Sequence, residues 1–362
     1  MKILFLITSL DVGGAERQVL DLAERLTQKG HEVLIAYMTG RGALISPGMS
    51  ITTLGLGCTK SGLSFIRCIF RVQSLVRQFK PDVMHSHMYH ANIVARIARL
   101  IVRVPRLICT AHSNNEGGRL RMFAYRITNF IASITTNVSQ GAVDAFERKG
   151  AVRRGHMLAI PNGIDIDKFS FKPEVRSCIR RAEGIGDEDK VILAVGRLVE
   201  AKNYPGLLVA FSVVYQNNKN LTLWIIGDGE LMEELILLSQ RLNIGDRVKF
   251  WGMRQDVELF YSSADVYVLS SAWEGFGLVV AEAMAAERVV VATDCGGVRE
   301  VVGEQGILVA PGRPKDLATA MESALKLDAA DARSLGYRAK ERIIANYSIE
   351  TIVAKWLQLY QN

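Results

Sequence analysis

Residues 2–28 read KILFLITSLDVGGAERQVLDLAERLTQ. An apolar run is followed by a turn with two adjacent glycines, and then by apolar residues at helical spacing. This order predicts a buried strand over Lys2–Ile7 and a helix over Ala15–Gln28, the repeating unit of a parallel α/β sheet. Acidic residues follow the apolar run at once, without a small-residue cleavage site, so we expect a strand here and no signal peptide.

The same alternation continues along the chain and then starts afresh at Val191–Val195. A length of 362 residues suits two domains. We therefore predict an α/β protein with two Rossmann-like, doubly wound parallel sheets facing across a cleft. The predicted domains are residues 1–167 and 168–345, with a C-terminal helix in residues 346–362 packing back on the first. The polar stretch from the turn at Pro161–Asp165 to Lys190 is the predicted linker.

Composition excludes several classes of protein. With 49% hydrophobic and 22% charged residues and 8 prolines, the chain is neither disordered nor fibrous. Its 5 cysteines are scattered and never spaced as C-x-x-C, which argues against a disulfide framework and a structural zinc site and favours a reducing cytosol. Charged residues interrupt every long apolar run, so no membrane span is expected.

Positive charge is concentrated in the N-terminal half. Residues 1–167 hold 21 Lys and Arg against 11 Asp and Glu, whereas residues 168–362 hold 23 against 26. Between Lys60 and Arg126 there are 12 basic residues and two acids, Asp82 and Glu116. A basic amphipathic helix is predicted over Leu63–Lys80, and it suits anionic lipid or nucleic acid, although an ordinary solvated helix face is also compatible. Its basic residues are Arg67, Arg71, Arg77 and Lys80.

Two strand ends carry residues suited to phosphate. Gly13 and Gly14 open the first helix, where free backbone amides can approach a phosphate, although a purely structural turn is equally compatible. This is not the G-x-G-x-x-G of a dinucleotide site. Arg197 and Lys202 follow the first strand of the second domain and together form a candidate diphosphate clamp.

The most specific motif runs from Glu274 to Glu282, EGFGLVVAE. Glu274 is predicted in a glycine-bearing loop and Glu282 about one turn into the next helix, so both carboxylates can face one site. Amides at the helix start around Gly277 and Leu278 suit a phosphate, and a glutamate can accept from vicinal sugar hydroxyls. A glycosidase pair of carboxylates is the alternative. Beside basic phosphate binders, recognition of a nucleotide sugar is favoured.

These motifs, taken in order, resemble those of bacterial retaining glycosyltransferases of family 4, which have the GT-B fold, and the resemblance covers essentially the whole chain. It rests also on Thr110–His112, on the turn at Pro161–Asp165 and on residues 81–87 and 227–230. The resemblance implies that Arg197 and Lys202 hold the donor diphosphate, Glu282 the ribose and Glu274 the transferred sugar. It also implies that Gly13 and Gly14 approach the donor phosphate and the acceptor, and that His112 lies beside the anomeric centre.

The remaining predicted site residues are assigned by their place beside these motifs. Further donor contacts are expected at Met253, Gly275, Phe276, Gly277 and Leu278, and acceptor contacts at Glu16, His85 and His87. No metal is expected, because the family needs none and the basic pair supplies positive charge. Asp165 and Asp167, which imitate a metal-binding D-x-D, are interpreted as a structural turn. No carboxylate nucleophile is evident. The family is described as using front-face return, in which the leaving diphosphate deprotonates the acceptor hydroxyl.

The predicted activity is therefore a retaining transfer of a sugar from a UDP-sugar to a polyprenyl-diphosphate-linked saccharide, in O-antigen, capsule or similar polysaccharide synthesis. An N-acetylhexosamine or galactose is the expected sugar, while uracil and guanine both stay open as the donor base. The expected location is cytoplasmic, peripheral on the inner face of the bacterial inner membrane, with anionic lipid as a partner and no nucleic acid. The alternatives are a non-hydrolysing nucleotide-sugar epimerase and, in a different class, a basic nucleic-acid-binding protein.

Overall fold

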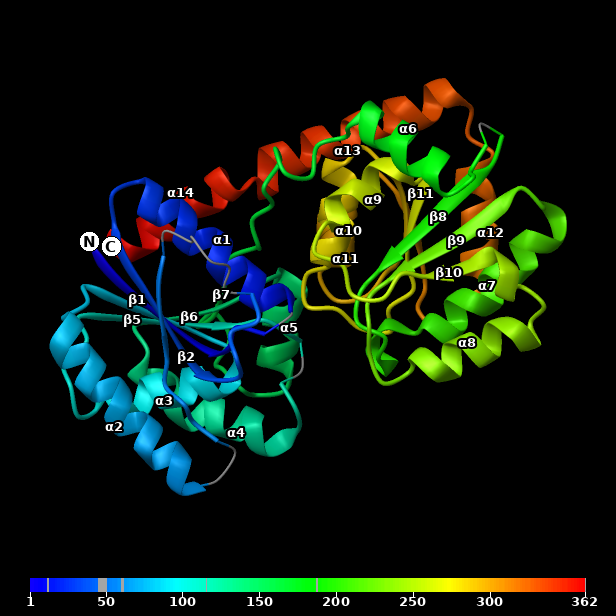
Figure 1. Ribbon diagram of the computed structural model, residues 1–362. Helices are drawn as coiled ribbons and strands as arrows, with labels where there is room; N and C mark the ends of the chain where they lie inside the picture. The colour runs from blue at the N-terminus through cyan, green and yellow to red at the C-terminus, as the bar shows by residue number, and fades with distance from the viewer. Residues whose placement is uncertain (12, 45–50, 60–61, 115, 187, 362) are drawn as a thin grey trace. The chain divides into compact units, whose positions relative to one another are not determined.

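The computed structural model describes residues 1–361 except residues 12, 45–50, 60–61, 115 and 187, and contains two parallel sheets (Figure 1). Val12 of the glycine turn and Lys60 of the basic segment lie outside the described residues. The chain divides into two compact units, Met1–Gly163 together with the residues from Ile349 onward, and Ile164–Ser348. The predicted α/β fold with two Rossmann-like sheets is confirmed. The chain passes from the first unit to the second after Gly163 and returns to the first after Ser348. The sequence analysis placed these two boundaries after residues 167 and 345.

The first sheet is wound outward in both directions from its centre. Its first strand, β1, lies between β2 and β4, and the strand order is β3-β2-β1-β4-β5-β6-β7. The strands are β1 (Lys2–Ser9), β2 (Glu32–Thr39), β3 (Thr52–Gly55), β4 (Val83–His87), β5 (Arg106–Ala111), β6 (Ile134–Asn137) and β7 (Leu158–Ala159). The winding reverses between β1 and β4, and beyond the carboxyl ends of two such strands lies the position, called the crevice, where open α/β sheets bind ligands.

Helices cover both faces of this sheet. Helices α2 (Gly62–Phe79) and α3 (Tyr89–Arg99) share one apolar core with it, and α1 (Gly14–Gln28) and α14 (Ile349–Gln361) share the other. A third cluster joins Met122 and Tyr125 of α4 (Arg119–Thr128) to Phe146 of α5 (Gln140–Arg148), and the short 3-10 helix η1 (Asn129–Ile131) follows α4. The C-terminal helix is therefore part of the first unit, with Trp356 in its core.

The second sheet repeats this winding. Its first strand, β8, lies between β9 and β11, and the order is β10-β9-β8-β11-β12-β13. The strands are β8 (Lys190–Val195), β9 (Leu221–Ile226), β10 (Val248–Phe250), β11 (Val266–Leu269), β12 (Val289–Thr293) and β13 (Ile307–Val309). The crevice at the carboxyl ends of β8 and β11 is therefore the expected ligand position in this unit.

The helices of the second unit also lie on both sides of their sheet. The core on one side includes residues of α7, α8 and α12. The helical elements are α6 (Pro173–Ala182), η2 (Glu200–Lys202), α7 (Tyr204–Asn217), α8 (Met232–Arg241), η3 (Gly245–Arg247), α9 (Val257–Ser263), α10 (Leu278–Ala285), α11 (Val298–Val302), α12 (Pro314–Leu325) and α13 (Ala329–Tyr347). Across the described part of the chain, no helix combines the length and apolar character needed to cross a membrane.

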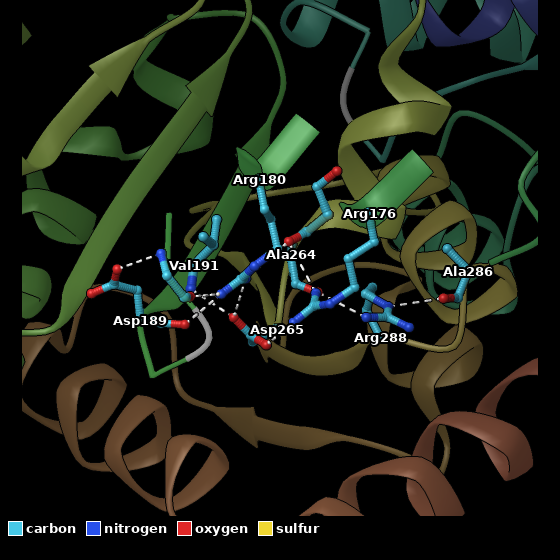
Figure 2. Close-up of polar contacts among 10 residues, drawn as sticks. Arg176, Arg180, Asp189, Val191, Ala264, Asp265, Ala286 and Arg288 are labelled. Atoms are coloured by element: carbon cyan, nitrogen blue, oxygen red, sulfur yellow. Dashed lines mark hydrogen bonds and ion pairs between the residues drawn. The ribbon is translucent and has the colours of Figure 1, made fainter. Parts of the chain in front are cut away.

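The predicted linker is wrong in part, because the polar stretch before Lys190 contains helix α6. Figure 2 shows Arg176 and Arg180 of α6 converging on Asp265, which precedes β11. The Arg176 Nη2 to Asp265 Oδ1 distance is 2.6 Å, and the other carboxylate oxygen accepts from the Val191 amide at 2.8 Å. Two arginines on one carboxylate hold the helix against the sheet, which composition alone did not indicate.

Candidate active site

The loop after β8 is packed tightly against its neighbour. Gly227 follows β9, and a Cβ atom at this position would lie 1.9 Å from the carbonyl oxygen of Gly196, so only glycine fits. The loop then forms η2 and ends at Asn203, whose left-handed conformation (φ 47°) and side-chain oxygen begin α7. This turn fixes Lys202 at the carboxyl end of β8.

Lys202 and Glu274 form an ion pair at the crevice of the second sheet. The distance from Lys202 Nζ to Glu274 Oε1 is 2.5 Å, and the two side chains are 19% and 13% exposed. Ser271 Oγ donates to the same carboxylate oxygen at 2.7 Å. An ammonium group has three donors, so Lys202 can retain Glu274 and still bind a phosphate. The sequence predicted both residues at the site but did not predict their pairing.

Two loops are joined directly behind this pair. Ser270 Oγ donates to the Lys202 carbonyl oxygen at 2.8 Å, and the Ala272 amide donates to Ala201 at 2.8 Å. Thr293 Oγ1, at the end of β12, donates to the Ser271 carbonyl oxygen at 2.6 Å. The β8 and β11 strand ends are thus held in register by hydrogen bonds. Sequence reasoning missed these hydroxyl residues, although Ser271 could have been noticed three residues before Glu274.

Helix α10 begins directly after the Glu274 loop. Gly277 is its N-cap residue, directly before Leu278, and has φ 92°, a conformation that favours glycine. On the helix, Glu282 accepts a hydrogen bond of 2.8 Å from the Tyr261 hydroxyl, which also donates to the Val279 carbonyl oxygen at 3.2 Å. Burial, followed by the negative charge of Glu282, raises the pKa of Tyr261 well above its usual value, so Tyr261 stays a donor.

The other predicted donor residues differ in what they can offer a ligand. Arg197 is exposed, and Met253 is 61% exposed. The Phe276 side chain is instead buried, with its ring centroid 5.4 Å from that of Tyr347, so it stabilises the core and leaves only backbone groups for a ligand. Leu278 begins α10, and Gly275 lies in the loop three residues before it. Trp273, which the sequence analysis overlooked, exposes its indole beside Glu274.

The first unit places a second group of predicted residues at its own crevice. Gly13 immediately precedes α1 and Gly14 begins it, both just after β1. A Cβ atom on Gly13 would lie 2.3 Å from the Glu16 carboxylate, so that glycine permits the carboxylate to fold over the turn. Glu16 is buried and accepts from Ser9 Oγ at 3.1 Å. Its carboxylate therefore shapes the turn after β1.

His85, predicted on the acceptor side, belongs to the core instead. Its side chain is fully buried, with Nδ1 2.7 Å from the Tyr360 hydroxyl and Nε2 2.7 Å from Thr110 Oγ1. The alternation of side chains along β4 turns it toward α14, where its ring lies 4.5 Å from that of Trp356. It therefore fixes the C-terminal helix and cannot contact an acceptor in this arrangement.

His87 and His112 form a pair at the ends of β4 and β5. His87 Nδ1 lies 2.9 Å from His112 Nε2, while His87 Nε2 is buried without a hydrogen-bond partner among the described residues. Burial lowers the pKa of His112 to about 4 and that of His87 well below its usual value. Both rings are neutral at pH 7, so they can exchange hydrogen bonds but cannot act as cations for a phosphate.

Glu116 is a residue that the sequence analysis counted only as a charge. Its Oε1 accepts from the His112 amide at 3.3 Å, and its Oε2 accepts from the Tyr125 hydroxyl at 3.1 Å. Burial raises the pKa of its carboxyl group to about 7. Tyr125 is in turn bonded to Asn92 Nδ2 at 2.9 Å. Glu116 is therefore a positioning residue for the loop that carries His112.

The residues that the structure describes offer no arrangement suited to a metal ion. Within residues 1–361, apart from the omitted positions, no three His, Cys, Asp or Glu side chains are grouped to hold one. Asp165 Oδ1 accepts from the Lys168 amide at 3.1 Å, as in a turn. The absence of a metal requirement stays a prediction.

The buried histidines predict that stability falls in acid. Burial lowers the pKa of His85, His87 and His112, so the unfolded chain takes up protons below about pH 6.5 that the folded chain does not. Each such proton costs about 1.4 kcal/mol of unfolding free energy per pH unit, until the folded pKa is reached, about 4 for His112. Glu116 has the opposite effect, because its pKa is raised to about 7 in the folded chain. Between about pH 7 and pH 4.5 the folded chain therefore holds one proton more than the unfolded chain at this residue, and this proton stabilises the fold as the pH falls.

Urea denaturation between pH 7 and pH 5 measures this slope. We expect His87→Asn to reduce the slope by about one proton, or about 1.4 kcal/mol per pH unit. The exposed His156 provides the matched control, His156→Asn, which should leave the slope nearly unchanged. An unchanged slope in His87→Asn would show that folding does not lower the pKa of His87.

Comparison with known proteins covers nearly the whole chain. A profile described as Glycosyltransferase Family 4 matches residues 12–168, and one described as Glycosyl transferases group 1 matches residues 175–342. The chain is 27% identical over 345 residues to the N-acetylgalactosamine-N,N'-diacetylbacillosaminyl-diphospho-undecaprenol 4-alpha-N-acetylgalactosaminyltransferase of Campylobacter jejuni, covering 90% of this chain and 91% of that protein.

Other similar proteins agree with these matches. The UDP-Gal:alpha-D-GlcNAc-diphosphoundecaprenol alpha-1,3-galactosyltransferase of Escherichia coli is 26% identical over 60% of this chain and 59% of its own length. The crystal structure of Anabaena HepE with UDP and glucose has a TM-score of 0.89 and 25% identity, covering 100% of this chain and 99% of that one. The likeness extends over both units.

Proposed function

Because the chain is a glycosyltransferase of the GT-B fold, with a family 4 half and a group 1 half, we propose that it moves a sugar from a UDP-sugar to a polyprenyl-diphosphate-linked saccharide with retention of configuration. The observation that carries the proposal is the Lys202–Glu274 pair at the crevice between β8 and β11. A cation for the leaving diphosphate and a carboxylate for the sugar hydroxyls lie there side by side.

The proposed chemistry uses positive charge on the leaving group. The bond from the anomeric carbon to the diphosphate oxygen breaks while the acceptor oxygen bonds to the same face of that carbon. The acceptor proton passes to the departing diphosphate. Arg197 and Lys202 stabilise the charge that grows on this group, so their effect is largest in the transition state. Because they supply this charge, the proposal includes no divalent metal.

Each partner in the proposal has separate support. The uracil base is supported by the UDP complex of HepE, and the lipid-linked acceptor by the undecaprenol-linked substrates in the names of the Campylobacter and Escherichia enzymes. Those names also support an N-acetylhexosamine or galactose as the transferred sugar. We place the reaction in O-antigen or capsule synthesis at the inner face of the bacterial inner membrane. There the positive charge of the first unit faces anionic lipid.

A donor and acceptor screen tests the proposal. Purified protein is incubated with UDP-N-acetylglucosamine, UDP-N-acetylgalactosamine, UDP-galactose, UDP-glucose or GDP-mannose and with polyprenyl-diphosphate-linked sugars, with and without EDTA. We expect UDP release that depends on the acceptor and persists in EDTA, and an α-linked product by NMR. Interconversion of UDP-sugars without an acceptor would identify an epimerase instead. Loss of activity in EDTA with rescue by Mg²⁺ or Mn²⁺ would overturn metal independence.

Alanine variants of the two glutamates should have different kinetic defects. Glu282→Ala removes the proposed ribose contact, and we expect KM for the UDP-sugar to rise about 10-fold with kcat little changed. Tyr261 keeps its bond to the Val279 carbonyl oxygen, so the fold should persist. Glu274→Ala should lower kcat about 100-fold, because the sugar is no longer oriented. Steady-state kinetics measure both, with the exposed Glu304→Ala as control. A pure KM effect in both variants would contradict these roles.

A further inference from the structure

A buried tyrosine of the second unit is bonded to the carboxylate of Glu282. Tyr261 belongs to α9, and its hydroxyl oxygen lies 2.8 Å from Glu282 Oε2 and 3.2 Å from the Val279 carbonyl oxygen. Both acceptors belong to α10, the helix that carries Glu282. A hydroxyl has one hydrogen to donate, and a charged carboxylate is a stronger acceptor than a carbonyl oxygen. The Tyr261 hydroxyl therefore donates mainly to Glu282.

The side chain of Tyr261 is itself held in place. It is 0% exposed, and its ring centroid lies 5.9 Å from that of Phe169 and 5.7 Å from that of Tyr267. Arg176 of α6 donates to the Ser263 carbonyl oxygen at 3.0 Å and so anchors the last residue of α9. A side chain packed in this way has no room to change rotamer. Its hydroxyl is therefore a fixed donor beside α10.

A fixed donor matters for Glu282 because the last torsion of a glutamate side chain is broad. The Glu282 side chain is partly exposed, so a ligand can reach its carboxylate. Two vicinal hydroxyls can both donate to a carboxylate only when its plane is turned toward them. The bond from Tyr261 to Oε2 restricts this rotation, and the carboxylate still has lone pairs for a ligand. A group that is oriented before binding loses less entropy when the ligand arrives.

We propose that Tyr261 is a positioning residue that orients the Glu282 carboxylate toward the ribose of the donor, and so sets the preference of the site for ribonucleotides over deoxyribonucleotides. The inference rests on the proposed function, because it takes Glu282 as the ribose contact. A site built to bind a hydroxyl rejects a ligand that lacks it, since the polar group of the site then stays unpaired. Without the Tyr261 hydroxyl, the carboxylate is free to turn toward water, and the missing ligand hydroxyl costs less.

Calorimetric titration with UDP, 2′-deoxy-UDP and 3′-deoxy-UDP tests the inference. The wild-type protein should bind UDP about 10-fold more tightly than at least one of the deoxy analogues. Tyr261→Phe should lower this preference to about 3-fold, because the carboxylate is no longer oriented. Glu282→Ala should abolish the preference. In the Glu282→Ala background, Tyr261→Phe should have no further effect on the binding of UDP, because we propose that it acts through that carboxylate.

Tyr267 provides the matched control. It is also buried, and its ring packs against Tyr261, but its hydroxyl has no hydrogen-bond partner among the described residues. Tyr267→Phe should therefore keep the wild-type preference, and circular dichroism checks the fold of each variant. A merely structural role of Tyr261 would weaken the binding of all three ligands equally. An unchanged preference in a folded Tyr261→Phe protein would overturn the inference, and so would a further loss of UDP binding in the Glu282→Ala background.

These titrations separate the inference from the proposed function, because they need no sugar and no acceptor. The ribose is the same in UDP and GDP, so GDP and its deoxy analogues take the place of the uridine ligands if the base is guanine. A protein that shows the expected preferences but transfers no sugar would overturn the proposed function alone. A wild-type protein that transfers sugar from a UDP-sugar but binds UDP and both deoxy analogues equally would overturn the role of Tyr261 alone.

Discussion

Replacing Lys202 with alanine should lower kcat about 10²- to 10³-fold, corresponding to about 3 to 4 kcal/mol. The side chain lies at the crevice of the second sheet, 2.5 Å from Glu274, where we propose that it stabilises the departing diphosphate. The fold should be retained, because Glu274 keeps its hydrogen bond from Ser271 and the two loops stay joined through backbone groups. Initial rates with saturating donor measure the effect.

A second variant separates the loss of the positive charge from the loss of side-chain volume. Lys202→Gln keeps a donor of similar length without charge, and it should be nearly as impaired as the alanine variant if charge is what matters. Lys315→Ala, an exposed lysine on α12, should be as active as wild type. Near-normal turnover of a folded Lys202→Ala protein would remove Lys202 from the mechanism.

Replacing Trp356 with alanine should destabilise the first unit by about 3 to 5 kcal/mol. Trp356 is 4% exposed and lies in the core shared by α1, α14 and the first sheet. Its ring centroid is 4.5 Å from that of His85 and 6.1 Å from that of Tyr360, so the substitution opens a cavity beneath β4. Urea denaturation followed by circular dichroism measures the loss.

A second tryptophan in the chain provides the matched control. Trp273 is 44% exposed, and Trp273→Ala should change the free energy of unfolding much less than Trp356→Ala. Trp356→Phe should recover part of the loss, because it refills part of the cavity. Equal stabilities of Trp356→Ala and wild type would show that α14 contributes little to the first unit.

The elements predicted from periodicity were found where apolar spacing is strong. The first strand and helix occur at Lys2–Ser9 and Gly14–Gln28, and the expected basic helix occurs as α2. Short elements without such spacing were missed, including β3 and β7. Helix α6 was mistaken for linker because its helical face is mainly charged, and two arginines bonded to a carboxylate hold it in place.

The outcome for the histidines shows where reasoning from motifs ends. A histidine at a strand end suggests a site, and His87 and His112 do pair at the crevice. His85 has the same kind of sequence context and is as buried as His87, but its hydrogen bonds go to Tyr360 of α14 and to Thr110. Its burial depends on Tyr360, which is 275 residues away in the chain. No local pattern contains that information.

The sequence by itself determined the two parallel-sheet units and which strand ends carry glycines, basic residues and carboxylates. These features follow from local periodicity and from residue chemistry at short spacing. Only the tertiary structure decided that Lys202 pairs with Glu274, that His85 is core, and that Leu120 and Phe123 of α4 are exposed. The physical reason is that pairing and burial depend on the order of strands and on which helix covers which face. Contacts between residues far apart in the chain establish both.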